Sequence, residues 1–134
     1  MKQLNGIPHN ITESVIGVIS TKGVNLLKRG NTILVDPMAK DNAFGYKATI
    51  TALSEIKPKG KVVAKVQNIS DFHDGDVVLL NEKGEIIFHY EINSLHNAIF
   101  ATGRCNHRCI MCPQPPVTEE PDYFDFNCKI ISLC

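Results

Sequence analysis

Short runs of β-branched and apolar residues, each followed or preceded by turn residues, most constrain what this chain can fold into. Valine, isoleucine and threonine favour the extended conformation, and every run has the length of one strand. Turn signals at Gly30-Asn31, Asp36-Pro37 and Pro58-Lys59-Gly60 lie between them. We expect strands in residues 15–20, 32–36, 47–53, 61–69, 75–80 and 85–91. Because no long helical period interrupts these runs, residues 1–95 are predicted to form a small β-rich N-terminal domain.

Two connections in this region have readable signals. Asn81-Glu82-Lys83-Gly84 is a four-residue connection with glycine last, and it predicts a hairpin between residues 75–80 and 85–91. The carboxylates of Asp71, Asp74 and Asp76 lie just before it and lack the ligand spacing of a calcium-binding loop. We therefore expect them in a solvated turn.

The pattern changes after Ser94. Residues 97–103 are small and apolar almost without interruption, which is typical of a strand buried on both faces of a parallel sheet. Pro113, Pro115 and Pro116 exclude a helix through the stretch that follows, because proline lacks the backbone donor and fixes φ. A helix is predicted from about Pro121 to Cys134, since proline is tolerated in a first turn and acidic residues surround that position.

The predicted helix has one narrow polar stripe, formed by Asp125, Lys129 and Ser132. Asp125 and Lys129 have the i,i+4 spacing of an ion pair. Apolar residues cover much of the remaining surface, so we expect neighbours on more than one side of the helix. Cys128 and Cys134 lie on the apolar side, and we expect them to be buried structural cysteines.

Three further cysteines, Cys105, Cys109 and Cys112, lie between the predicted strand and the predicted helix with C-x3-C-x2-C spacing. Three thiolates can hold three corners of a [4Fe–4S] cluster and leave one iron with an open position, as catalysis at a metal requires. Positive or donor side chains of Arg104, His107 and Arg108 would lie beside the anionic cluster and tune its potential. A structural zinc site with His107 or Cys128 as fourth ligand, or no metal at all, are the alternatives.

Charge and hydropathy exclude several classes of partner. Fourteen basic side chains balance fourteen acidic ones, so the chain lacks the positive field of a nucleic-acid-binding protein. No apolar run approaches the ~20 residues of a membrane span, and the first ten residues do not resemble a signal peptide. We therefore expect a cytoplasmic protein, in which clustered cysteines favour metal binding over disulfides.

The cysteine segment, read with its surroundings, resembles a known family. C-N-H-R-C-I-M-C-P-Q-P-P, from Cys105 to Pro116, is similar to the radical S-adenosylmethionine (SAM) maturase of the His-Xaa-Ser repeat system. The sequence from Gly75 through Leu95 to the cysteines resembles it too. The resemblance implies that the open iron binds SAM and that an electron from the cluster cleaves it to the 5′-deoxyadenosyl radical. It also places Met111 next to the adenine, where the family usually has an aromatic residue.

The resemblance further implies an α+β fold. The β-rich domain of residues 1–95 would be followed, in residues 96–134, by the first β-loop-α unit of a radical SAM partial (β/α) barrel. A complete eight-fold barrel needs ~250 residues, so the barrel would be incomplete in this chain. We therefore expect the chain to be too short to cleave SAM at a useful rate by itself.

The resemblance implies a ribosomally made peptide or small protein as substrate, a sister radical SAM protein, and a complementary chain that supplies the rest of the barrel. Two other hypotheses are a non-catalytic β-rich binding module with a structural zinc site and a non-functional remnant of the enzyme. The sequence identifies neither the substrate nor the hydrogen atom that is abstracted.

Overall fold

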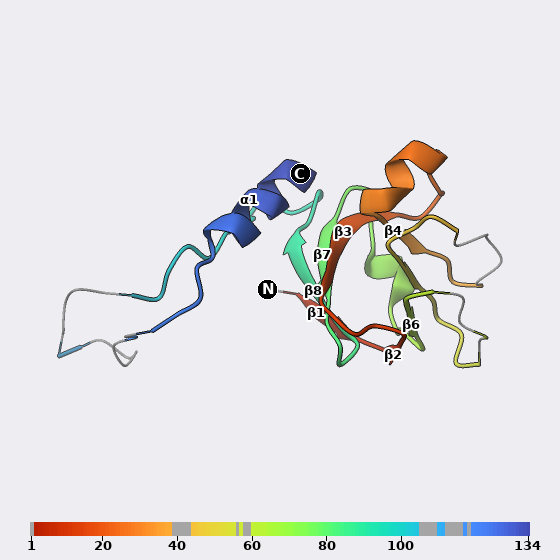
Figure 1. Cartoon of the computed structure of the whole chain (residues 1–134), viewed down its shortest axis with the longest axis horizontal. Helices are drawn as coiled ribbons and strands as arrows, with labels where there is room; N and C mark the ends of the chain where they lie inside the picture. Colours follow the sequence, from red (N-terminus) through yellow and green to blue (C-terminus); the bar gives the residue numbers. More distant parts are fainter. Residues whose placement is uncertain are drawn as a thin grey trace.

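A computed structural model describes residues 2–38, 44–55, 57, 60–104, 110–111, 117 and 119–134. These residues form eight strands, two short 3-10 helices and one α-helix (Figure 1). In chain order the elements are β1 (Gln3–Asn5), β2 (Ile7–His9), β3 (Val15–Ser20), η1 (Leu26–Asn31), β4 (Thr32–Val35), β5 (Ala48–Ile50), β6 (Val62–Ala64), η2 (Ile69–Asp71), β7 (Val77–Leu80), β8 (Glu85–Tyr90) and α1 (Phe124–Leu133).

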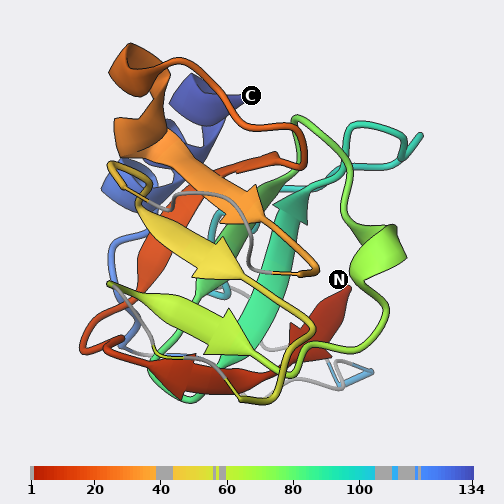
Figure 2. The ribbon, with the colours of Figure 1, turned by 90° about the vertical axis from the view of Figure 1, so that its right-hand side faces the viewer.

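All eight strands belong to one mixed sheet with the order β1-β8-β7-β3-β4-β5-β6-β2. The pairs β3–β4, β4–β5 and β5–β6 are parallel, and the other pairs are antiparallel. The two outermost strands, β1 and β2, follow each other in the chain and are separated only by Gly6. The sheet therefore closes on itself at this corner, and its strands wrap around a common interior (Figure 2).

Close backbone approach explains why the corner residue is a glycine. The Gly6 N–H donates a hydrogen bond of 2.9 Å to the Gly84 carbonyl, which ties the corner to the β7–β8 hairpin. A Cβ atom at Gly6 would lie 2.5 Å from the Val63 side chain on β6. No larger residue fits without displacing the strands that the corner joins.

The main hydrophobic core fills the interior of the closed sheet. Alternate residues of each strand point inward, as the two-residue period of a strand requires. Phe72 and Phe88 stack in this core with ring centroids 5.2 Å apart. The buried members of the core are Ile11, Val15, Ile19, Ile33, Val35, Ala48, Ile50, Val63, Val66, Phe72, Val78, Leu80, Ile86 and Phe88.

Helix α1 packs against the outer face of the sheet rather than the interior. Ile130 is buried against Ile16 of β3 and Val77 of β7, and Phe126 and Leu133 pack partly against the same cluster. These three helix residues recur at i, i+4 and i+7, which is one helical stripe. On the opposite side Phe124 and Ile131 are largely exposed. Within the described part of the chain, α1 thus contacts the sheet through this stripe and residues 98–100 through Phe126 and Asn127, whereas the side with Phe124 and Ile131 is uncovered.

The prediction that Cys128 and Cys134 are buried is wrong, because both are exposed. Cys128 lies between Phe124 and Ile131 on the stripe of α1 that faces away from the sheet. The prediction assumed that neighbours cover the whole apolar surface of the helix, whereas the sheet covers only the stripe around Ile130.

The predicted α+β fold with a β-loop-α unit of a (β/α) barrel is also wrong. The structure is mostly β, a mixed eight-stranded sheet with one short C-terminal helix. Residues 97–103 do not form the expected buried strand: Ile99 and Phe100 are 46 % and 54 % exposed. This run has no strand beside it in the described sheet, so its backbone lacks the ladder of hydrogen bonds that a strand needs.

The local predictions in residues 1–95 are confirmed where the structure describes them. Each of the six expected runs contains an observed strand, and β7 and β8 form the expected hairpin. Helix α1 begins at Phe124, three residues after the expected start. Strands β1 and β2 were not predicted, because they are short and β2 contains Pro8. The division of the chain at residue 95 stays a prediction.

Candidate metal-binding loop

The cysteine triad lies outside the described residues, as does His107. The flanking residues are described on both sides: residues 98–104 precede the triad, and residues 119–123 follow it. We call these two segments together the arm (Figure 1). Between the cysteines, Met111 is 91 % exposed, and Ile110 is also fully exposed. The structure therefore defines how the ends of the cysteine loop are held.

Glu120 joins the two ends of the loop. The Gly103 N–H donates a 2.8 Å hydrogen bond to Glu120 Oε2, and the Thr102 hydroxyl donates to Glu120 Oε1. Arg104 completes the contact: its Nη2 donates to the Glu120 carbonyl at 3.2 Å, and its Nε lies 3.7 Å from Oε1. The Glu120 side chain is only 10 % exposed. One carboxylate thus closes the segment that contains all three cysteines.

These contacts favour the charged form of the carboxylate. Hydrogen bonds from the Thr102 hydroxyl and the Gly103 amide, with a smaller contribution from Arg104, hold the pKa of Glu120 below its usual range. The Glu120 side chain, which we call the clamp, is therefore a carboxylate at neutral pH. From the sequence, Glu120 is one of the acidic residues around Pro121 that favour a helix start, and no local pattern indicates its partners seventeen and eighteen positions earlier.

A second set of contacts continues the pairing toward α1. The rings of Phe100 and Tyr123 meet edge to face with centroids 5.2 Å apart. Asn127 Nδ2 donates a 3.0 Å hydrogen bond to the Phe100 carbonyl. The two halves of the arm therefore run side by side from the helix to the cysteine loop (Figure 1).

A small apolar cavity of about 100 Å³ lies where the arm meets the sheet, lined by Ala98, Phe100, Phe126 and His89 among others. The His89 ring meets the Phe126 ring edge to face at 5.1 Å. Burial lowers the pKa of His89, because the charged imidazolium is disfavoured away from water. The cavity is therefore lined by a neutral imidazole at pH 7.

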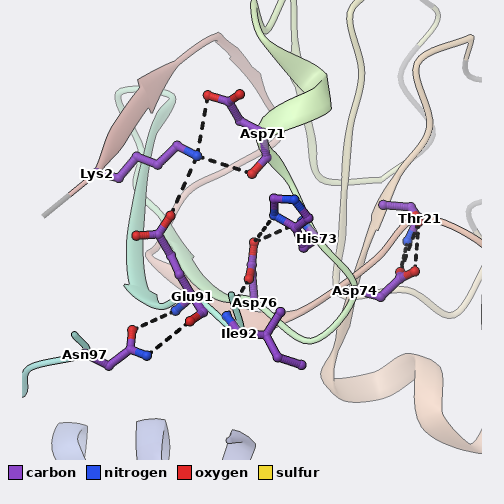
Figure 3. A network of polar contacts seen from close by, with 9 residues as sticks. All are labelled: Lys2, Thr21, Asp71, His73, Asp74, Asp76, Glu91, Ile92 and Asn97. Carbon is purple, nitrogen blue, oxygen red and sulfur yellow. Dashed lines mark hydrogen bonds and ion pairs between the residues drawn. The ribbon is translucent and has the colours of Figure 1, made fainter. Parts of the chain in front are cut away.

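A buried carboxylate fixes the chain where it leaves the sheet for the arm (Figure 3). Asp76 is 0 % exposed, and its Oδ1 and Oδ2 accept hydrogen bonds of 2.9 Å from the Ile92 and His73 amides. Just beyond, the Asn97 side chain accepts from the Glu91 amide at 2.9 Å and donates to the Glu91 carbonyl at 3.1 Å. The expected solvated turn is thus wrong for Asp76, which connects the β7 side of the sheet to the base of the arm.

Asp71 and Asp74 are more exposed members of this network. Asp71 pairs with Lys2 at 3.4 Å, and Lys2 also lies 3.7 Å from Glu91. Asp74 accepts hydrogen bonds from the amide and the hydroxyl of Thr21 (Figure 3). The carboxylates of Asp71, Asp74 and Asp76 thus each have their own partners, and they do not converge on one point.

Other metal sites are not found in the described part of the chain. Outside the cysteine loop, no group of three or more His, Cys, Asp or Glu side chains among the described residues is arranged to hold a metal ion. No described helix has the length and hydropathy that crossing a membrane requires.

The chain matches no protein-family model, no curated protein and no solved structure. The resemblance to the radical SAM maturase therefore stays a prediction, based on the residues of the cysteine segment.

Proposed function

We propose that this chain is an iron–sulfur protein that binds a [4Fe–4S] cluster through Cys105, Cys109 and Cys112. We further propose that the fourth iron binds SAM, and that the chain is part of a radical SAM enzyme that modifies a ribosomally made peptide of the His-Xaa-Ser type. The observation that carries the proposal is the C-x3-C-x2-C spacing on a loop whose two ends are joined by Glu120.

The donor set fits such a cluster. Three thiolates match three irons, and no fourth cysteine lies within the loop to complete a purely electron-transferring cluster. Joining the loop ends lowers the conformational entropy that metal binding must remove, because the loop is already closed. When bound, the cluster would supply the electron that cleaves SAM.

The flanking residues have more specific roles than the sequence indicated. Arg104 pairs with Glu120 and supports the loop from its base. Met111 is exposed, and its place beside the adenine of SAM rests on the resemblance. The peptide substrate and the sister protein rest on the resemblance alone.

Anaerobic reconstitution with iron and sulfide tests the proposal. The purified chain should bind about four irons, the content of one cubane cluster. Alanine at Cys105, Cys109 or Cys112 should abolish iron binding, whereas Cys128→Ala is the matched control because its thiol is exposed on α1, outside the loop. EPR of the reduced protein should change on adding SAM if the fourth iron is open.

Two results would contradict the proposal. A colourless protein with one zinc ion, lost in Cys128→Ala or His107→Ala, would identify a structural zinc site instead. A fully loaded cluster whose EPR spectrum is the same with and without SAM would exclude SAM binding by this chain.

A further inference from the structure

A second candidate site lies on the outer face of the sheet, away from the cysteine loop. A cleft of about 530 Å³ opens where β3 ends and β4 begins, beneath the connection that contains η1. Val18 and Ser20 form its wall from β3, Thr32 from β4, and Lys28 from η1. Its volume is in the range of sites for small molecules, which is about 300–1,000 Å³.

Two cations line this cleft without a countercharge. Lys22 and Lys28 are both exposed, and neither has an ion-pair partner among the residues that the structure describes. The cleft has one carboxylate, Asp74, and its oxygens already accept hydrogen bonds from the Thr21 amide and hydroxyl. Two positive charges against one engaged negative charge leave the cleft with a net positive charge.

Hydroxyl side chains line the same cleft. Ser20 as a residue is only 7 % exposed, and within the described part of the chain its hydroxyl has no hydrogen-bond partner. No buried side-chain nitrogen or oxygen among the described residues lacks a partner, so the Ser20 hydroxyl is open to solvent in the cleft and free to bond a ligand there. The Thr32 hydroxyl donates to the Lys28 carbonyl at 2.8 Å, which leaves its oxygen free to accept. A ligand with acceptor oxygens would satisfy Ser20 and both lysines.

We propose that this cleft binds the phosphate group of a small molecule. Lysine binds phosphate as a point charge, and serine contributes one O–H donor to a phosphate oxygen. A phosphate group fills only part of the volume, and the Val18 side of the cleft contacts the organic part of the ligand. The site is independent of the proposed cluster, since it uses none of the residues of the arm.

Titration of the ¹⁵N-labelled full chain with ribose 5-phosphate, followed by NMR, tests the site. The amide signals of residues 18–24, 28 and 32 should shift with saturation, and sodium chloride at the same ionic strength should not reproduce this. The same titration with inorganic phosphate is the comparison. If inorganic phosphate binds more weakly than ribose 5-phosphate, the ligand is a phosphorylated organic molecule, and equal binding of the two would overturn that part of the proposal.

Lys22 and Lys28 are exposed, so their substitution leaves the fold intact and separates binding from stability. Lys22→Gln and Lys28→Gln should each weaken ribose 5-phosphate about tenfold, the effect of losing one charge-assisted hydrogen bond. Ser20→Ala should weaken it as well. Lys83→Gln, on the distant β7–β8 connection, is the matched control. Equal affinity in Lys22→Gln, Lys28→Gln and Lys83→Gln would overturn the proposal.

Discussion

Replacing Asp76 with alanine should destabilise the sheet more than any other single change in the network of Figure 3. The substitution removes the acceptor of two hydrogen bonds, from the His73 and Ile92 amides. A hydrogen bond to a charged group contributes about 1.5–3 kcal/mol, so the pair contributes about 3–6 kcal/mol. Water can reach both amides once the carboxylate is gone, because His73 and Ile92 are exposed, and a buried charge is also removed. We therefore expect a loss of about 2–3 kcal/mol.

Urea unfolding followed by circular dichroism measures this loss as a lower midpoint with an unchanged slope. Asp71→Ala is the matched control, because Asp71 belongs to the same network but forms a partly exposed ion pair with Lys2. Exposed ion pairs contribute about 0–1 kcal/mol, so the control should lose less than about 1 kcal/mol. If Asp76→Ala and Asp71→Ala unfold at the same urea concentration, the buried carboxylate does not hold the base of the arm.

Two further predictions concern the clamp and the hairpin. Because the pKa of Glu120 is lowered, the stabilisation by its carboxylate is complete above the ordinary glutamate pKa and is lost as the pH falls through the lowered value. The Gly103 amide signal in NMR should follow that titration, and a Gly103 signal that titrates identically in Glu120→Gln would show that another group is responsible. Gly84→Ala should cost more than about 2 kcal/mol in urea unfolding, because Gly84 has φ +82° and a Cβ there would collide with the Gly6 carbonyl. Gly60→Ala, with φ +91° and open space, should cost only about 1–2 kcal/mol, and equal losses would contradict the role of the closed corner.

The six strands from β3 to β8 were predictable because their signals are local. The β-branched runs and the glycine of the hairpin indicate extended backbone whatever the remote partner is. The order of strands and their parallel pairing depend on residues far apart in the chain, and nothing in a short window specifies them. The apolar run of residues 97–103 shows the same limit, because composition favours a buried strand but only a neighbouring strand can provide one.

The residues of the candidate site show the same difference between local and distant signals. The spacing of Cys105, Cys109 and Cys112 is local and indicates metal binding without a structure. Glu120 and Asp76 could not be identified in this way. Each appears in the sequence as an ordinary acidic residue near a turn or a helix end. The Ile92 amide lies sixteen positions from Asp76, and the Gly103 and Thr102 partners lie seventeen and eighteen positions from Glu120. The prediction that Cys128 is buried was wrong for a related reason, since the sequence does not indicate which of the two apolar stripes of α1 the sheet covers.

The corner at Gly6 has a consequence for the order of folding. Gln3 on β1 pairs with Ile87, which is the most distant strand pairing of the described sheet, and His9 on β2 pairs with Val62, also far along the chain. Contacts between distant segments form late, because the chain entropy of loop closure must be overcome before they stabilise anything. Until β1 and β2 arrive, β8 and β6 have open edges that can pair with another molecule. The first ten residues therefore complete folding and also end the period in which the chain is most exposed to aggregation.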